Sequence, residues 1–289
     1  MLAPSPRVRR SAQRKGRTAA CRMRNVSSRQ NPIVRTFREL GDHPDPTGER
    51  VLLDGAHLVR DAHAAGAVFE VVVVAASKLQ PATEEGTLAV ALENADVDVV
   101  SADDKVFSAL SPVKTPSGLA AIARRKVSAP PLICGHDRAF VVAAVDVQDP
   151  GNVGSLLRAA EAGGATGAFV CGASANPFSW KSLRGSMGSA LRLPVVAGMT
   201  TEAVVACMKS ARLRLVAAVP QGGEPPDEID WRGQVGLLVG GEGAGLTEDI
   251  IAQSDVRVTV PMAVTVESLN VAVAAGILIY AARRQRVAP

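Results

Sequence analysis

Three stretches in the second half of the chain combine glycines and polar residues at spacings that suit ligand binding. The first is Gly240–Gly245 (GGEGAG), which directly follows the apolar run Val235–Val239. Glycines after a strand allow the backbone to approach a nucleotide closely. In dinucleotide-binding folds this turn follows the first strand, whereas here only the 44 residues up to Pro289 follow Gly245. The loop is therefore either a ligand site in a fold whose last strands form the site, or a tight turn.

The second stretch, Asp149–Arg158 (DPGNVGSLLR), predicts a turn and the first turns of a helix, with Asn152 as the N-cap. Arg158 follows Gly154 by one helical turn, and helical side chains lean toward the N-terminus. Its guanidinium would then extend over a residue without a side chain, which leaves room for a phosphate or a substrate oxygen. The alternative is an ordinary capped helix with a surface arginine.

The third stretch, Val260–Asn270, leads into a helix expected over Val266–Arg284. This helix is apolar all round, which predicts burial on every side. Its first turn nevertheless carries Glu267, Ser268 and Asn270. Polar groups at a buried helix end need partners, and a helix N-terminus favours ligand oxygens. The alternative is a capped core helix without a ligand.

Composition excludes several other classes of site. The four cysteines are scattered without a C-x-x-C pair, and the four histidines form no metal-ligand pattern, so we expect reduced thiols and no metal. No run reaches the 18 or so apolar residues of a membrane span, so we expect no membrane contact and a cytoplasmic location. Aromatic residues make up only 3 %, which argues against a nucleic-acid module built on aromatic stacking.

The basic charge of the chain is concentrated at its N-terminus. The net charge is +4, but residues 1–25 hold eight arginines and lysines and no acid. The remainder holds 24 basic and 28 acidic residues and is therefore near −4. We expect a disordered tail over residues 1–25. It is a basic arm with RNA affinity, an organelle transit peptide, or a segment outside the native product with Met23 as the true start.

Strands and helices alternate over the rest of the chain, which predicts two α/β domains with a largely parallel sheet in the second. We expect a domain over residues 26–126, a linker over 127–138 and a second domain over 139–289. Predicted strands cover 51–53, 69–76, 97–100, 119–123, 140–145, 168–171, 193–196, 213–219, 235–239 and 256–260. Predicted helices cover 31–40, 56–65, 87–94, 105–110, 153–162, 202–210, 247–253 and 266–284.

The three stretches together resemble the three motifs of the SpoU (TrmH-like) RNA 2′-O-ribose methyltransferases of the SPOUT class. The matching segments are residues 149–158, 239–246 and 260–272, and Arg184–Pro194 (RGSMGSALRLP) also matches. Residues 31–34, 51–59 and 115–118 resemble the ribosomal-protein-like substrate-binding domain of the family. Asp54 and Ser117 depart from the glutamate and glutamine that are common there, which affects substrate detail. The resemblance covers about residues 26–285.

The resemblance implies an S-adenosylmethionine-dependent enzyme whose catalytic α/β domain has a deep trefoil knot and a largely parallel sheet. A smaller N-terminal α/β domain would bind the substrate. The cofactor would be held by the backbone around Gly240, Val260 and Leu269. The residues expected beside it are Leu238, Gly241, Met262, Ser268 and Ala272.

The implied reaction moves a methyl group to a ribose 2′-hydroxyl. Arg158 would anchor the phosphate and activate the hydroxyl, because a guanidinium rarely acts as a base. Asn152, Glu242, Ser268 and Asn270 would shape the site and position the ribose.

The family also implies a homodimer in which Arg158 serves the facing subunit, and large-subunit (23S) ribosomal RNA as the substrate. The alternatives are a tRNA 2′-O-methyltransferase and a noncatalytic RNA-binding or ribosome-assembly protein on the same scaffold. Local basic patches, Arg124–Lys126 and Lys181–Arg192, are the expected RNA contacts.

Overall fold

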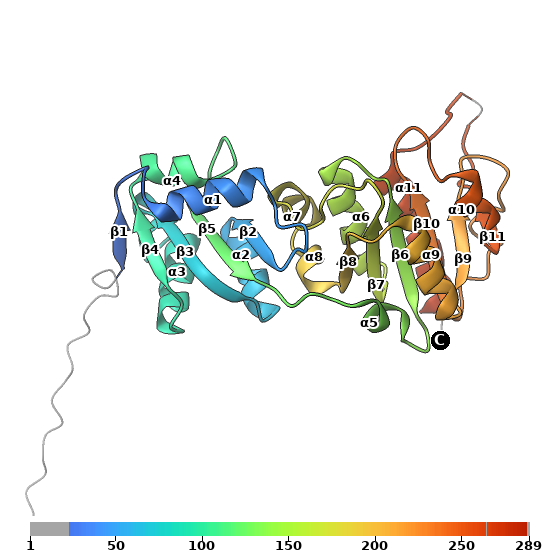
Figure 1. Cartoon of the computed structure of the whole chain (residues 1–289), viewed down its shortest axis with the longest axis horizontal. Coiled ribbons are helices and arrows are strands. Elements are labelled where there is room, and N and C mark those ends of the chain that lie inside the picture. Colours follow the sequence, from blue (N-terminus) through green and yellow to red (C-terminus); the bar gives the residue numbers. More distant parts are fainter. Residues whose placement is uncertain (1–22, 264, 288–289) are drawn as a thin grey trace, which may run out of the picture.

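Two β-sheets lie one after the other along the long axis of the molecule, each with its own helices (Figure 1). The computed structural model describes residues 23–263 and 265–287. Most of the expected disordered tail, residues 1–22, lies outside the described residues. The expectation is wrong for Arg24 and Asn25, which belong to strand β1 (Arg24–Val26). They are held there because Val26 is buried and the Arg24 guanidinium pairs with Asp98 at 2.7 Å.

The first sheet is mixed and has the strand order β1-β4-β3-β5-β2 among the described residues. Strands β1, β4 and β3 pair in parallel, and β5 pairs antiparallel with both β3 and β2. The strands are β2 (Arg50–Asp54), β3 (Val68–Ala75), β4 (Val99–Ala102) and β5 (Leu119–Arg124). The helices are α1 (Pro32–Asp42), α2 (Ala56–Ala64), α3 (Glu84–Asn94) and α4 (Asp104–Leu110). This smaller α/β unit agrees with the expectation for the first part of the chain.

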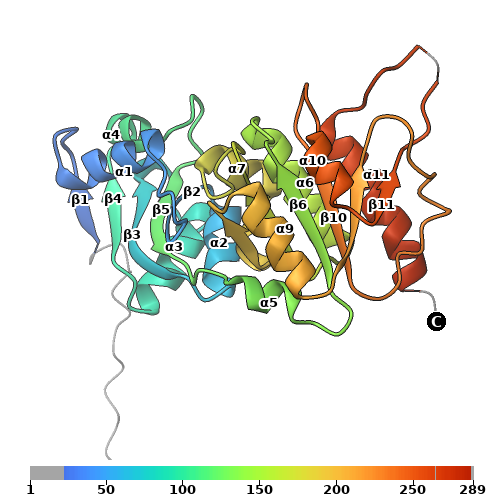
Figure 2. The ribbon, with the colours of Figure 1, turned by 45° about the vertical axis from the view of Figure 1, so that its right-hand side comes forward.

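The second sheet has six strands in the order β11-β9-β10-β6-β7-β8, and all described pairs are parallel. The strands are β6 (Phe140–Val145), β7 (Gly167–Cys171), β8 (Val195–Ala197), β9 (Arg214–Ala218), β10 (Val235–Gly240) and β11 (Val256–Val258). The expected parallel sheet is confirmed. Strands β6 and β10 are distant in sequence but are central neighbours in the sheet, where Gly240 pairs with Val145 (Figure 2). The trefoil knot that the resemblance implies stays a prediction.

Helices cover both faces of the second sheet because every β6 side chain is buried, alternately on one face and the other. Helices α6 (Pro150–Ala162) and α11 (Val271–Arg286) pack on one face, with α7 (Trp180–Ser186) and α8 (Ser189–Arg192) beside them. Helices α5 (Pro130–Cys134), α9 (Thr201–Ser210) and α10 (Glu248–Ala252) pack on the other. The expected linker over 127–138 therefore needs correction, because it contains α5, whose Ile133 is fully buried in this core.

Helix α11 differs from its prediction in two ways. It begins at Val271 rather than at residue 266, because the Asn270 side chain caps it by accepting bonds from the Ala272 and Val273 amides. It is also not buried all round, since Val273 is 52 % and Tyr280 50 % exposed. No helix within the described ranges is long and apolar enough to cross a membrane.

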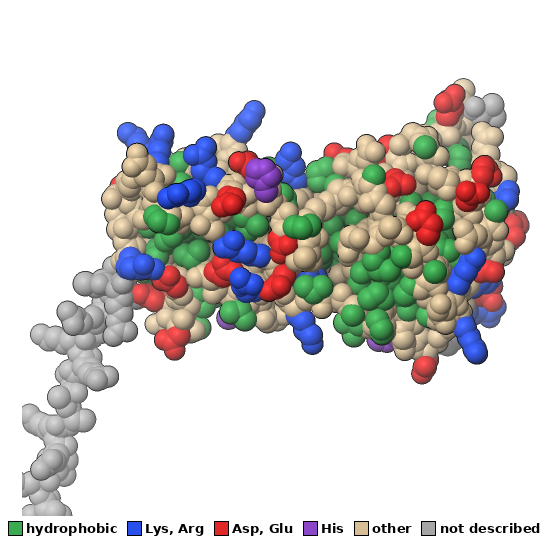
Figure 3. Space-filling model, in the orientation of Figure 1, with side chains coloured by type: hydrophobic (Ala, Val, Ile, Leu, Met, Phe, Trp, Pro, Cys, Tyr) green, Lys and Arg blue, Asp and Glu red, His purple; other side chains and the backbone are tan. Residues whose placement is uncertain are grey.

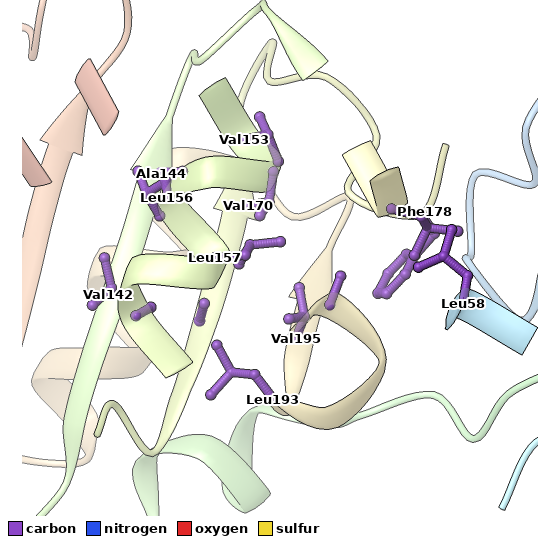
Figure 4. Packing of buried hydrophobic residues seen from close by; sticks show 14 of the residues in the cluster. Leu58, Val142, Ala144, Val153, Leu156, Leu157, Val170, Phe178, Leu193 and Val195 are labelled. Carbon is purple, nitrogen blue, oxygen red and sulfur yellow. The ribbon is translucent and has the colours of Figure 1, made fainter. Parts of the chain in front are cut away.

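The two sheets share one continuous apolar core. Phe178, which precedes α7, is only 3 % exposed and lies against Leu58 of α2 (Figure 4). The guanidinium of Arg125 stacks on the Phe178 ring at 3.8 Å, and a Cβ at Gly48 would lie 2.0 Å from the same ring. An ion-pair cluster adds to this contact, because Arg192 of α8 binds Asp61 of α2 at 2.7 Å. The two parts therefore hold a fixed orientation.

We predict that Phe178→Ala lowers the free energy of unfolding by about 3–5 kcal/mol, because it leaves a ring-sized cavity in the shared core. Chemical denaturation measures this change. Val68→Ala, at a side chain that is 68 % exposed, serves as the control and should change it by less than about 0.5 kcal/mol. A loss below about 1 kcal/mol for Phe178→Ala would contradict the shared core.

Candidate active site

The candidate site lies where β6 and β10 end side by side, at the carboxyl edge of the parallel sheet. The Gly241 amide donates to the Val145 carbonyl at 2.7 Å, and a Cβ at Gly241 would lie only 2.0 Å from the Asp146 oxygen. Only glycine permits this approach. Asp146 has a left-handed backbone (φ 56°), and its Oδ1 accepts from the Ala173 amide after β7 at 2.6 Å. The turns after β6, β7 and β10 are thus locked together.

Helix α6 begins in this edge of the sheet, but its cap differs from the expectation. Asp149 is the N-cap, and its carboxylate accepts from the Asn152 amide at 2.8 Å. The predicted cap, Asn152, lies inside the first turn instead. The Asp149-Pro150 pair carried this signal in the sequence, since proline favours the first helical position after a cap. Because Asp149 is the cap, the Asn152 side chain remains free to contact other groups.

A chain of polar side chains joins the three stretches that the sequence singled out. The Asn152 amide group donates to a Glu242 carboxylate oxygen, and Asn270 Nδ2 donates to Asn152 Oδ1 at 3.0 Å. The Asn270 oxygen in turn caps α11. Three of the five predicted catalytic residues are therefore joined by hydrogen bonds. Glu242 and Asn270, which both contact Asn152, lie 90 and 118 residues after it in the sequence. Both hydrogen bonds are solvent-exposed, so a substrate hydroxyl can reach these side chains.

Arg158 and Ser268, the other two predicted catalytic residues, lie apart from this chain. Arg158 is exposed and follows Asn152 by six residues along α6, a rise of about 9 Å. In residues 23–263 and 265–287, it takes part in no ion pair and no side-chain hydrogen bond. Ser268 is exposed just before α11. A single chain therefore leaves the Arg158 cation free.

The space that we expected above Gly154 is filled. A Cβ there would lie 2.5 Å from the Ser182 carbonyl oxygen and 2.7 Å from the Ser186 amide of α7. The absent side chain thus serves close packing of α6 on α7 rather than ligand access. The neighbouring Gly185 of α7 approaches Gly151 in the first turn of α6 in the same way.

The residues expected at the cofactor lie in β10 and the glycine-rich turn Gly240–Gly245, in the segment before α11, or, for Ala272, in the first turn of α11. Gly240 ends β10, and a Cβ on it would lie 2.3 Å from the Gly245 carbonyl carbon, so the loop folds tightly back on itself. Gly243 and Gly245 have left-handed φ values of 92° and 66°, and nothing lies within 4 Å of a Cβ built on either. Leu238 is buried and Ser268 is exposed. The other expected side chains are half-buried: Val260, Met262, Leu269 and Ala272.

This loop can accept a flat, polar ligand. Its two open glycines leave a surface without side chains, and half-buried apolar groups are available to cover a ring. No cluster of three or more metal-ligating side chains occurs in the described part of the chain. The arrangement thus combines a ligand loop with an amide–carboxylate chain at the start of two helices.

Comparison with known proteins finds one family over the same region. A model of the SpoU rRNA Methylase family matches residues 139–280. An uncharacterized tRNA/rRNA methyltransferase of Synechocystis is 32 % identical over 91 % of this chain and 94 % of its own length. The 23S rRNA (guanosine(2553)-2′-O)-methyltransferase RlmP of Bacillus subtilis is 30 % identical over 89 % of this chain and 98 % of its own length.

Solved structures match over both sheets. The AdoMet-bound rRNA methyltransferase of Sinorhizobium meliloti has a TM-score of 0.80 and 29 % identity, and the match covers 92 % of this chain and 99 % of that one. An RNA 2′-O ribose methyltransferase has a TM-score of 0.74 and 30 % identity, over 91 % of this chain and all of that one.

We predict that Gly154→Ala destabilises the fold by about 1–3 kcal/mol, because its methyl group would overlap the α7 backbone. Gly41→Ala is the matched control, since it also lies in a helix but meets only ordinary contacts at 3.4 Å or more. It should be neutral or slightly stabilising, because alanine favours a helix. Thermal unfolding of both variants measures the difference, and equal effects would contradict the close packing of α6 on α7.

Proposed function

Because the chain belongs to the SpoU rRNA methylase family, we propose that it transfers a methyl group from S-adenosylmethionine to a ribose 2′-hydroxyl of large-subunit ribosomal RNA. The observation that carries this proposal is the side-chain contact of Asn152, Glu242 and Asn270 beside the glycine-rich turn. The predicted family, enzyme class and cofactor are confirmed by the relatives and by the AdoMet-bound neighbour.

The glycine-rich turn fits S-adenosylmethionine. Gly243 and Gly245 leave open surface at which no Cβ would intrude, and Gly240 lets the loop fold tightly. We propose that the backbone around Gly240, Val260 and Leu269 holds the adenosine, with these side chains nearby: Leu238, Gly241, Met262, Ser268 and Ala272. When bound, the cofactor supplies an electrophilic methyl group.

The hydrogen-bonded polar side chains at this site would position the ribose. Asn152 is held from both sides, since it donates to Glu242 and accepts from Asn270, so its amide has a fixed orientation. We propose that Asn152, Glu242, Asn270 and the exposed Ser268 orient the 2′-hydroxyl. Preorganised polar groups of this kind lower the barrier without moving during the reaction.

Arg158 would hold a substrate phosphate and polarise the hydroxyl. A guanidinium is a very weak acid that keeps its proton, so it stabilises developing negative charge rather than removing a proton. Its exposure and lack of an ion partner in the described residues leave all of its donors for the substrate.

We further propose a homodimer in which Arg158 serves the facing subunit. Asn152 and Arg158 are six residues apart on α6, so they lie about 9 Å apart along the helix axis and about 120° apart around it, which points the two side chains in different directions. Helix α11 offers the surface, since Val273, Ile277 and Tyr280 are 52 %, 42 % and 50 % exposed. Exposed apolar side chains at this spacing form one helix face and favour a second copy as the partner.

Residues 26–126 would form the RNA-binding domain and residues 139–289 the catalytic domain. A ribosomal substrate is favoured over tRNA because the relatives that match both sheets include a 23S rRNA enzyme. That substrate is also what supports a cytoplasmic location. A tRNA substrate remains the second candidate, because the Synechocystis relative carries both substrates in its name.

Transfer of labelled methyl groups tests the function and the role of Arg158 together. We expect label in large-subunit rRNA and not in tRNA, at a 2′-O position. Arg158→Ala should reduce transfer at least about 100-fold while cofactor affinity, measured by calorimetry, stays within about twofold. Arg212→Ala, at another exposed arginine, is the control. Transfer to neither RNA would favour a noncatalytic RNA-binding protein, and undiminished turnover would refute the role of Arg158.

For the dimer, we predict that Ile277→Asp yields monomers in light scattering, because a charge on the apolar face of α11 cannot be buried without a partner. Transfer should fall with the loss of the facing Arg158. Val68→Asp, at an exposed apolar side chain of the first sheet, should leave the dimer intact. A monomeric wild-type enzyme with full activity would contradict the shared site.

A further inference from the structure

The cations of the first part of the chain and of α7 and α8 fall into two sets. One set is neutralised by carboxylates: Arg24 by Asp98, Arg50 by Glu70, Arg60 by Glu84, Arg124 by Glu49 and Glu70, and Arg192 by Asp61 and Glu161. The other set is exposed and, among the described residues, takes part in no ion pair. We call the following members the basic track: Arg35, Arg38, Lys114, Lys181 and Arg184.

The basic patches expected from the sequence are partly neutralised. Arg124 forms ion pairs with two carboxylates. Arg192 of α8 also forms two, with Asp61 of α2 and Glu161 of α6. Arg125 is stacked on Phe178, and burial lowers its pKa to about 10. The charges of Arg124 and Arg192 are therefore offset by carboxylates, whereas Arg125 keeps its charge but is half-buried against Phe178. Lys126, Lys181 and Arg184 are members of the expected patches that are exposed and, among the described residues, take part in no ion pair.

The elements that carry the basic track are linked by contacts from α1 to the candidate site. The end of α1 touches the loop 111–118, since a Cβ at Gly41 would lie 3.6 Å from Pro112. In the same loop, Ser111 donates to the buried carboxylate of Asp54 at 2.8 Å. The charge of Arg184 on α7 acts on that carboxylate, opposing the burial that raises its pKa.

The α7 end of the basic track reaches the catalytic edge. Gly185, next to Arg184, packs against Gly151 in the first turn of α6, one residue before Asn152. Figure 1 shows α1, α7 and the start of α6 along the same edge of the molecule. In Figure 3, blue side chains gather along the left half of this upper edge, whereas lower on the same face blue and red side chains lie against each other.

Two exposed acids of α1 partly offset the basic track. Glu39 and Asp42 follow Arg35 and Arg38 by one helical turn, but neither forms an ion pair with them in the part of the chain that the structure describes. Asp54 is 7 % exposed and lies beneath Ser111 rather than on the surface. Five exposed cations against two exposed acids leave a net positive surface, which favours a polyanion.

We propose that the basic track binds the sugar–phosphate backbone of the RNA and leads it from α1 to the ribose site at Asn152. This inference rests on the proposed function and adds the path of the substrate across both sheets. Arginine and lysine bind phosphate oxygens without contacting the bases. The basic track would therefore position the RNA but would not select it by sequence. Because the two sheets share a core, the path has a fixed length.

Binding of a fluorescent large-subunit rRNA transcript at increasing KCl tests the proposal. Each lost phosphate contact should reduce the slope of log affinity against log salt by about 0.7–0.9. We expect Arg35→Gln/Arg38→Gln to reduce the slope by about 1.5 and the affinity about tenfold near 0.1 M salt. In methyl transfer, KM for RNA should rise while kcat at saturating RNA stays within about twofold.

The matched control is Arg24→Gln/Arg60→Gln, which removes the same charge from two exposed but paired arginines. It should change the slope by less than about 0.5, because those cations already have carboxylate partners. Lys114→Gln/Lys181→Gln should behave like the α1 pair, which guards against a folding defect in either variant. Cofactor affinity should be unchanged in all three.

Equal slopes for the track variants and the control would overturn the proposal, since net charge alone would then explain binding. An unchanged slope in both track variants would overturn it as well. Wild-type binding without any methyl transfer would count against the proposed reaction, while a reduced slope in the track variants would still support the RNA path.

Discussion

The close approach of the turns after β6 and β10 is the constraint on which the site depends. Gly241 lies so near the Asp146 carbonyl that no side chain fits between them, and the Asp146 carboxylate binds the turn after β7. This contact fixes where α6 starts relative to the glycine-rich turn. Asn152 and Glu242 can meet only because the two turns are locked, and Asn270 joins them as it caps α11. Site geometry therefore follows from backbone packing at one sheet edge.

The regular elements were largely predictable from the sequence. Strands β6 and β10 were expected within one residue of their observed ends, because buried parallel strands are continuous apolar runs. The cap of α6 was not, since Asp149 and Asn152 are both good caps and only the backbone decides between them. Gly154 shows the same limit. A sequence reveals that a side chain is absent, but not whether a ligand or a neighbouring helix occupies the space.

The joint between the two sheets was the larger failure. A segment with prolines, a glycine and charges predicted a linker, yet Ile133 enters the core of the second sheet and Phe178 enters a core that both sheets share. Burial of these side chains depends on partners more than 30 residues away, which local patterns do not contain. The consequence bears on the proposed function, because an RNA bound by the first part of the chain would be presented to the second sheet at a fixed distance.

Which cations can bind a polyanion depends on which of them already form ion pairs with carboxylates. The net charge of +4 and the runs of adjacent arginines both pointed to a polyanion, but neither identifies the cations that remain available. Arg124 and Arg192 already hold carboxylates in place of counterions, so RNA would release few ions from them. Arg35, Arg38 and Arg158 have no carboxylate partners among the described residues. They would exchange their solvent counterions for phosphate. In this fold, the paired cations join elements to one another, and Arg35, Arg38 and Arg158 are the unpaired ones that we propose to bind the substrate.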